Sequence, residues 1–187
     1  MSTATDALRA RNLRTLAALA ALFLLPLALA FLTYYGTGWR PLGHVNHGTL
    51  ISPARPLPPM APWRGKWSLV YVGAGGCDAA CRQALLLMRQ TRLALNTDMT
   101  RVARVFLVSA DCCDREFLAR EHAGLIVLDA SGADRQRLLR EFPATDRADT
   151  VFVVDPLGNL MMRYDARQNP RGLLEDLKKL LRLSQIG

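Results

Sequence analysis

Two cysteines separated by three residues, Cys77 and Cys81, are the clearest candidates for chemistry in this sequence. In a helix that begins beside them, the two sulfurs lie one turn apart on one face, within reach of each other or of a shared ion. The amino terminus of a helix also stabilises a thiolate, which is the form that attacks disulfides and binds metals. Because two thiolates suit the soft ion Cu(I), the spacing predicts thiol–disulfide exchange or copper binding. A structural disulfide in an oxidising compartment is the alternative.

A second pair of cysteines, Cys112 and Cys113, follows the next buried run of residues. Loops after neighbouring parallel strands emerge at the same edge of a sheet, so the four sulfurs could share one rim. If Asp111 caps the following helix, both cysteines occupy its first turn, where a thiolate is favoured. We expect no disulfide between them, because a vicinal disulfide ring is strained, so each would serve as a third metal ligand or a resolving thiol. Incidental small buried residues are the alternative.

The histidines offer further metal ligands, but their positions favour simpler roles. His44 and His47 have the spacing of a metal-binding pair. No third ligand lies near them in the sequence, so we expect an exposed loop pair. His122 falls late in a predicted helix, beside Glu121, and we expect it at the surface.

From Trp67 onward, short apolar runs alternate with segments of helical spacing, which favours a parallel or mixed sheet covered by helices on both faces. The expected strands are residues 67–72, 102–108, 125–128, 150–155 and 160–164. The expected helices are residues 79–95, a segment capped by Asp111 or Asp114 that ends near 122, residues 134–142, and a last helix capped by Asn169 and opened by Pro170.

This order of elements is that of the thioredoxin fold, and three motifs sharpen the comparison. They are the run Trp67-Ser-Leu-Val-Tyr-Val leading into Cys77-x-x-x-Cys81, the run Val105-Phe-Leu-Val-Ser-Ala-Asp111, and Phe152-Val-Val-Asp-Pro156-Leu-Gly158 followed by Tyr164. With them the chain resembles the Sco/SenC family, membrane-anchored thioredoxin-like proteins that serve copper-site assembly in cytochrome c oxidase. The resemblance covers residues 64–185 and the membrane anchor. It implies an α/β thioredoxin-like fold, a mixed central sheet flanked by helices, preceded by one N-terminal transmembrane helix.

The sequence departs from this family at the copper site. Sco proteins have a histidine nine residues before the proline of the Pro-x-Gly turn, and it is their third copper ligand. That position is Arg147 here, and a guanidinium has no lone pair to offer a metal. Its positive charge near Cys77 and Cys81 would instead favour their thiolate forms. Redox thioredoxins have a cis-proline where this chain has Asp149.

The leading hypothesis is therefore a copper or thiol–disulfide chaperone that acts through Cys77 and Cys81. The resemblance implies copper as the metal and the copper-binding subunit of cytochrome c oxidase as the partner. One alternative is a thiol peroxidase or disulfide reductase, with Cys77 as the nucleophile and Cys81 as the resolving thiol. The other is an assembly scaffold that has kept the fold and lost the metal site.

An apolar segment near the amino terminus predicts a membrane anchor. No charged residue occurs in the 25 positions from Thr15 to Trp39, whereas about 20 apolar helical residues cross a bilayer. Arginines precede the segment at positions 9, 11 and 14, which places the amino terminus in the cytoplasm. We expect a single-pass protein of the bacterial inner membrane with its carboxy-terminal domain in the periplasm. The run Ala28-Leu29-Ala30 imitates a cleavage site, so a cleaved signal peptide is the alternative.

Composition excludes several classes of protein. With 50% hydrophobic and 21% charged residues, the chain is neither disordered nor a multi-span membrane protein. Its net charge of +8 comes from basic residues spread along the sequence, so we expect no nucleic-acid partner. Six of the ten prolines lie in residues 41–63, which predicts an extended spacer. The expected divisions are a cytoplasmic segment 1–14, a transmembrane helix 15–36, a Pro-rich periplasmic linker 37–63 and a thioredoxin-like domain 64–187.

Overall fold

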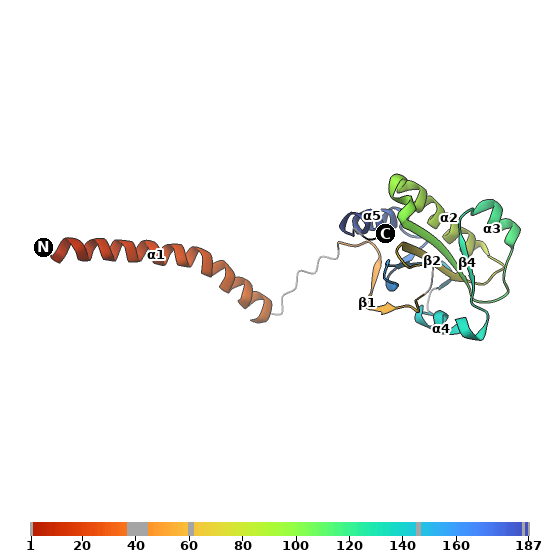
Figure 1. Cartoon of the computed structure of the whole chain (residues 1–187), viewed down its shortest axis with the longest axis horizontal. Coiled ribbons are helices and arrows are strands. Elements are labelled where there is room, and N and C mark those ends of the chain that lie inside the picture. The colour runs from red at the N-terminus through yellow and green to blue at the C-terminus, as the bar shows by residue number, and fades with distance from the viewer. Residues whose placement is uncertain (1, 37–44, 60–61, 145–146, 185, 187) are drawn as a thin grey trace. The chain divides into compact units, whose positions relative to one another are not determined.

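The computed structural model describes residues 2–36, 45–59, 62–144, 147–184 and 186. The chain divides into two units, and the division falls between residues 44 and 45. The first unit holds one long helix, and the second holds a sheet with its covering helices (Figure 1). An α/β domain preceded by an apolar helix is the architecture that the sequence predicts.

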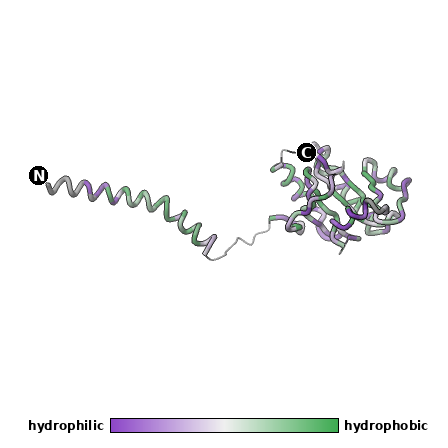
Figure 2. The backbone as a smooth tube through the Cα atoms, turned by 60° about the horizontal axis from the view of Figure 1, so that its bottom comes forward, coloured by the Kyte–Doolittle hydropathy of each residue, from purple (hydrophilic) through white to green (hydrophobic). Residues whose placement is uncertain are grey.

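The amino-terminal helix α1 extends over Ser2–Phe31 and continues as a π-helical turn, η1, over Leu32–Gly36. Leucine and alanine, both strong helix formers, dominate its apolar part. Within the described residues, Arg11–Gly36 is the one helical segment long and apolar enough to cross a membrane. Figure 2 shows hydrophobic residues following one another along it after a short polar stretch. The predicted span, residues 15–36, lies inside this segment.

The centre of the domain is a six-stranded sheet with the strands β1 (Thr49–Pro56), β2 (Trp67–Gly73), β3 (Val102–Val108), β4 (Ile126–Asp129), β5 (Thr150–Val154) and β6 (Asn159–Asp165). Their spatial order is β1-β6-β5-β2-β3-β4. The contacts β2–β3 and β3–β4 are parallel, and the other pairs are antiparallel, so the sheet is mixed as predicted. All of β5 and almost all of β2 and β3 is buried, because both faces of the sheet are covered.

Helices cover both faces of the sheet: α2 (Ala79–Ala94), α3 (Arg115–Glu121), α4 (Ala133–Glu141) and α5 (Pro170–Leu183). Short 3₁₀ segments, η2 (Asn96–Arg101) and η3 (Arg147–Asp149), precede β3 and β5. Buried residues of α2, α3 and α5 form one apolar cluster with one face of the sheet. Those of α4 form a second cluster with the other face, and Figure 1 shows α4 opposite α2 and α5.

The last helix illustrates how local sequence determines these elements. The Asn169 side chain accepts a hydrogen bond from the backbone N–H of Gly172 (2.8 Å), and Pro170 occupies the first turn. One face of α5 is apolar and buried, whereas the other is charged and exposed; the residues are Leu173, Leu177 and Leu181 on the first and Glu175, Lys178 and Lys179 on the second. The predicted cap, Asn169, and the predicted first residue, Pro170, are both confirmed.

The Pro-rich stretch contributes to the domain, which corrects the expected linker of residues 37–63. Strand β1 lies in that stretch and pairs antiparallel with β6 at one edge of the sheet. Trp63 is fully buried, and its indole N–H donates to the carbonyl of Pro58 (3.1 Å). Leu57 joins the same apolar cluster. The domain therefore begins before residue 64, because these side chains bury apolar surface against the strands, and the prolines exclude a central position only.

A buried carboxylate fastens the residues before β1 to α5. Asp176 accepts hydrogen bonds from the backbone N–H groups of His47 (2.7 Å) and Gly48 (3.0 Å) and from the Tyr164 hydroxyl (2.6 Å). Burial, and secondly this carboxylate, raise the pKa of Tyr164 well above its usual range, so the phenol stays protonated and remains a donor. The charge of Asp176 is thus satisfied by three donors in the interior.

Candidate functional site

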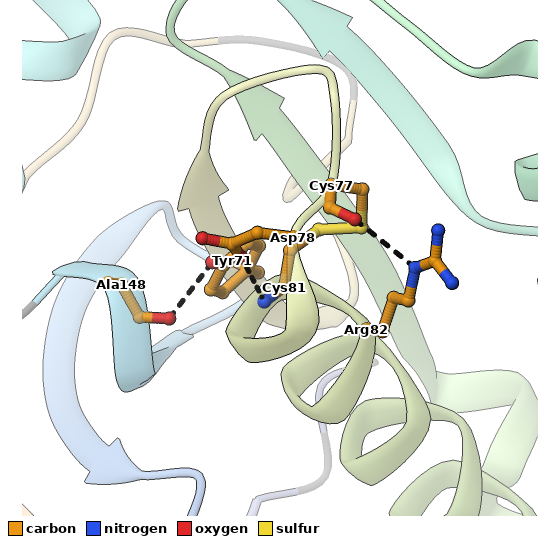
Figure 3. The surroundings of a disulfide bond; sticks show 6 residues. All are labelled: Tyr71, Cys77, Asp78, Cys81, Arg82 and Ala148. Carbon is orange, nitrogen blue, oxygen red and sulfur yellow. Dashed lines mark hydrogen bonds between the residues drawn. A yellow bond between two sulfur atoms is a disulfide. The ribbon is translucent and has the colours of Figure 1, made fainter.

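Cys77 and Cys81 lie where β2 leads into α2, as the sequence predicts. Residues 74–78 turn the chain after β2, and Cys81 is in the first turn of the helix. The two cysteines form a disulfide with their Cα atoms 5.0 Å apart (Figure 3). Both are almost completely buried, with 3% and 2% of their surface exposed. The pair is thus a disulfide at the amino terminus of a long helix, with little of either residue open to solvent.

Two side chains beside the disulfide hold its backbone in place. Asp78 is the N-cap of α2, and its carboxylate accepts a hydrogen bond from the backbone N–H of Cys81 (2.9 Å). The Arg82 Nε donates to the carbonyl of Cys77 (3.3 Å), and its guanidinium lies 5.0 Å from the centre of the Phe117 ring on α3. Asp78 is not among the site residues predicted from the sequence, although an aspartate directly before a predicted helix is an N-cap signal.

Tyr71 lines the same cavity as the disulfide and holds the segment that carries Arg147. Its hydroxyl donates to the carbonyl of Ala148 (2.9 Å), as Figure 3 shows. Burial raises the pKa of Tyr71 to about 12, and the negative charges of Asp78 and Asp149 add to this effect. The phenol therefore stays protonated at neutral pH and keeps η3 beside β2.

The disulfide lines a cavity of about 440 Å³ together with Tyr71, Ser109 and Arg147. Arg147 thus reaches the predicted location, but its hydrogen bonds go to the end of α4. Nε donates to the carbonyl of Pro143 (2.9 Å), and Nη2 donates to the carbonyls of Leu139 (2.6 Å) and Phe142. These bonds satisfy carbonyls at the carboxyl end of α4 and fix the guanidinium there.

The second cysteine pair differs from the prediction in two respects. Cys112 and Cys113 form a disulfide with each other, in the loop whose backbone packs against Gly75. The cap of α3 is Asp114, whose carboxylate accepts from the backbone N–H of Phe117 (3.0 Å), so both cysteines precede the helix. Cys112 is exposed and Cys113 is half-buried.

The two cysteine loops lie against each other, as expected from the parallel strands that lead into them. The backbone N–H of Gly75 donates to the carbonyl of Ala110 (2.8 Å), and that of Asp114 donates to the carbonyl of Gly75 (3.4 Å). A Cβ atom at Gly75 would lie 2.0 Å from the Asp111 carbonyl oxygen and 2.6 Å from the Cα of Cys112. Glycine is required there because the two backbones touch.

The two pairs nevertheless line different cavities. Cys112 and Cys113 border a cavity of about 520 Å³ that is lined also by Leu118, Leu125 and Val127. Within the described part of the chain, no three or more His, Cys, Asp or Glu side chains are grouped so that they could hold a metal ion. The third ligand expected from the second pair is therefore not found beside the first pair. When the disulfide is reduced, Cys77 and Cys81 leave two thiol sulfurs in this site.

The two histidines that the structure describes, His47 and His122, contact side chains of the fold. His44 lies outside the described residues, so the predicted pair is not tested. His47 is exposed, and its Nε2 lies 2.9 Å from the Glu175 carboxylate. His122 is 4% exposed, which corrects the expected surface position. His122 is the C-cap of α3, and its ring packs edge-on against that of Phe117, with the ring centres 5.4 Å apart, so the Phe117 ring helps to cover the imidazole.

Comparison with known proteins identifies the fold. Residues 67–184 match a family model described as a transmembrane-like, thioredoxin-like, C-terminal domain. The chain belongs to this family. No curated protein sequence matches the chain. The members of this family are thioredoxin-like, which agrees with the order of strands and helices described above and confirms the predicted fold class.

Solved structures with the same fold include copper-bound Sco proteins. The chain is 18% identical to ScoI of Bradyrhizobium japonicum with copper bound, over 63% of this chain and 86% of that one, with a TM-score of 0.51. It is 14% identical to yeast Sco1 with copper bound, over 65% of this chain and 82% of that one, with a TM-score of 0.57. It is 20% identical to ScoI of Arabidopsis thaliana with copper bound, over 65% of this chain and 88% of that one, with a TM-score of 0.51. At these low identities, the resemblance to Sco proteins is confirmed at the level of the fold.

Proposed function

We propose that this chain is a membrane-tethered thiol–disulfide exchange factor whose redox centre is Cys77–Cys81. The observation that carries the proposal is the disulfide itself, which spans the first turn of α2 and borders a cavity at the carboxyl end of β2. In a thioredoxin-like fold this position brings the sulfurs to a helix amino terminus, where the departing thiolate is stabilised.

The exchange reaction transfers two electrons from a client to the pair. A client thiolate attacks one sulfur of the Cys77–Cys81 disulfide, the bond between the two sulfurs breaks, and a mixed disulfide forms. A second client thiol then attacks the mixed disulfide, and Cys77 and Cys81 are released as a dithiol. The client leaves oxidised. The positive charge of Arg147, fixed in the same cavity, favours the thiolate that departs in the first step.

The proposed client and location follow from the anchor and from the Sco resemblance. We place the domain in the periplasm and the anchor in the bacterial inner membrane, because arginines 9, 11 and 14 precede the apolar segment. Residues 1–14 would then be cytoplasmic. The client class that we propose is the copper-binding subunit of cytochrome c oxidase, which the protein would help to assemble.

Copper is a second candidate, as cargo of the reduced pair. Two cysteine thiolates one helical turn apart suit Cu(I), which accepts low coordination numbers. Oxidation to the disulfide removes both donors at once, so binding would depend on the redox state of Cys77 and Cys81. Titration of Cu(I) into the reduced protein against a competing chelator tests this role, and a Cys77→Ser/Cys81→Ser variant should lose the binding.

A redox titration of the full chain in detergent tests the main proposal. The protein is equilibrated in glutathione buffers of increasing oxidation, the free thiols are alkylated, and the state of Cys77 and Cys81 is read by peptide mass spectrometry. We expect a reversible dithiol–disulfide transition of Cys77 and Cys81, with its midpoint inside the range of the glutathione buffers. The matched control, Cys112→Ser/Cys113→Ser, should keep the same midpoint for Cys77–Cys81.

Three results would contradict the proposal. A disulfide that stays closed across the whole range of buffers would make the pair structural. A stable sulfenic acid on Cys77 after peroxide treatment would instead support the peroxidase alternative. A protein that neither exchanges disulfides nor binds copper would be an assembly scaffold.

A further inference from the structure

The two disulfides differ in how easily an external thiol can reach them. Cys77 and Cys81 are 3% and 2% exposed, whereas Cys112 is exposed and Cys113 is half-buried. Thiol–disulfide exchange requires a thiolate to approach a sulfur directly, so burial slows it. An incoming thiol therefore meets the Cys112–Cys113 pair first. Each pair borders a cavity, of about 520 Å³ beside Cys112–Cys113 and about 440 Å³ beside Cys77–Cys81, so the two pairs differ in the exposure of the cysteines themselves.

The exposed pair is also adjacent to the buried one. The backbones of the two loops are in contact at Gly75, where an added Cβ would lie 2.6 Å from the Cα of Cys112. Because Cys77 follows Gly75 by two residues, its Cα is within about 12 Å of that of Cys112. Cys113 packs against the same apolar cluster that contains Cys77 and Cys81.

We propose that Cys112–Cys113 is a second redox centre, which accepts electrons from an external dithiol and passes them to Cys77–Cys81. This inference rests on the proposed function only in that the buried pair undergoes exchange. It adds a catalytic site whose substrate class is a dithiol. The buried pair would then be reduced faster through the protein than by direct attack of a thiol from solvent.

After one reaction with an external dithiol, the remaining electron transfer takes place between the two cysteine pairs of the chain. An external dithiol reduces Cys112–Cys113 and becomes a disulfide. One of the two new thiolates then attacks a sulfur of Cys77–Cys81, that bond breaks, and a mixed disulfide joins the two loops. The second thiol of the Cys112–Cys113 pair then attacks the mixed disulfide. The Cys112–Cys113 disulfide forms again, and Cys77 and Cys81 are released from it as a dithiol. A mixed disulfide needs Cα atoms about 4–7 Å apart, so the exposed loop must move toward residue 77.

The first test measures how fast each pair is reduced. The fully oxidised full chain in detergent is mixed with dithiothreitol, samples are quenched in acid, and alkylated cysteines are mapped over time. We expect Cys112 and Cys113 to be labelled first and Cys77 and Cys81 later. In Cys112→Ser/Cys113→Ser the reduction of the buried pair should slow at least about tenfold, because the direct route is hindered. The opposite double variant, Cys77→Ser/Cys81→Ser, should leave the reduction rate of Cys112–Cys113 unchanged.

The second test traps the intermediate. A Cys113→Ser variant leaves Cys112 without its neighbour, so the mixed disulfide cannot be resolved from the outer side. Mass spectrometry without reductant should then find a peptide linking Cys112 to Cys77 or Cys81. The companion variant Cys112→Ser tests Cys113 in the same way.

An unchanged rate in the outer double variant, together with no linked peptide in either single variant, would overturn the relay. The equilibrium titration of Cys77–Cys81 would be unaffected by that result, so the proposed function would stand. A buried pair that no reductant opens in any variant would instead remove the proposed function itself.

Discussion

The inner and outer cysteine pairs lie on touching loops, yet the fold holds them in different ways. The inner pair, Cys77–Cys81, is buried at the start of the 16-residue helix α2 and packs in the main apolar cluster. The outer pair, Cys112–Cys113, precedes the seven-residue helix α3 and is partly open to solvent. The inner pair is thus part of the core that stabilises the domain, whereas the outer pair can react or change shape with less effect on the fold.

The N-cap hydrogen bonds of α2 and α3 show the same difference between the inner and the outer pair. Asp78 and Asp114 are both N-caps, and each accepts a hydrogen bond from a backbone N–H three residues on. In the inner region that N–H belongs to Cys81, so the cap holds a reactive residue. In the outer region it belongs to Phe117, and both cysteines remain outside the capped turn. The proposed redox chemistry of the inner pair would therefore be coupled to helix stability.

The largest expected effect comes from separating the two loops. In Gly75→Ala the new methyl group meets the Asp111 carbonyl and the Cys112 backbone, so one loop must move away. We expect the free energy of unfolding to fall by about 3 kcal/mol. Guanidinium denaturation, followed by the fluorescence of the buried Trp63 and Trp67, measures it. Gly76→Ala is the control, because nothing lies within 4 Å of its Cβ position. Equal stability of the two variants would show that the loops are not in contact.

Removing the inner disulfide should lower the free energy of unfolding more than removing the outer one. Cys77→Ala/Cys81→Ala removes a crosslink and buried sulfur, and we expect a loss of about 2 kcal/mol in the free energy of unfolding. Cys112→Ala/Cys113→Ala changes partly exposed residues and should cost under about 1 kcal/mol. The same denaturation experiment measures both. If the outer variant is the less stable one, the contrast between a core pair and a surface pair is wrong.

Removing each cap should have similar effects on stability but different effects on chemistry. Asp78→Ala and Asp114→Ala should each lower the free energy of unfolding by about 1 kcal/mol, because each helix loses an N-cap bond. Only Asp78→Ala also removes a negative charge beside the inner sulfurs. We expect the reduced inner pair to be alkylated about threefold faster in that variant, since a nearby carboxylate disfavours a thiolate. Equal alkylation rates in both variants would contradict this coupling.

The smallest effect concerns pH and His122, which lines the same cavity as the outer pair. Burial, followed by the charges of Arg104 and Arg89, lowers the pKa of His122 below its ordinary 6.5, and Glu121 opposes this shift. The unfolded chain therefore binds the proton more readily, and the stabilisation present above pH 6.5 is lost as the pH falls through that value. Between pH 7 and 6, the Tm of the wild type should drop by roughly 1–2 °C more than that of His122→Gln. Parallel Tm curves for the two proteins would refute this.

The elements that the sequence predicts correctly are those with a strong local pattern. The buried strands β2, β3 and β5 are short apolar runs between turns, and the spacing of Cys77 and Cys81 requires only one helical turn. Their position at a helix amino terminus is therefore visible in the sequence. The fold class follows from the order of these elements.

The features that the sequence does not predict depend on distant partners. Strand β1 has no alternating pattern and is a strand because β6 pairs with it about 110 residues later. Trp63 is buried because Gly158 and the β5–β6 hairpin cover it. The disulfide of Cys112 with Cys113 depends on how the loop is shaped against Gly75, which residue type and spacing alone do not describe.

The form of β1 has a consequence for how the domain behaves at high concentration. An edge strand with free N–H and C=O groups can recruit a strand from another molecule and start aggregation. Here the outer strand carries Pro53 and Pro56, which lack N–H donors, and its register shifts between Leu50 and Arg55. A neighbouring chain would find an interrupted ladder and the exposed cation of Arg55. The proline-rich segment thus protects this side of the sheet from self-association while it completes the fold.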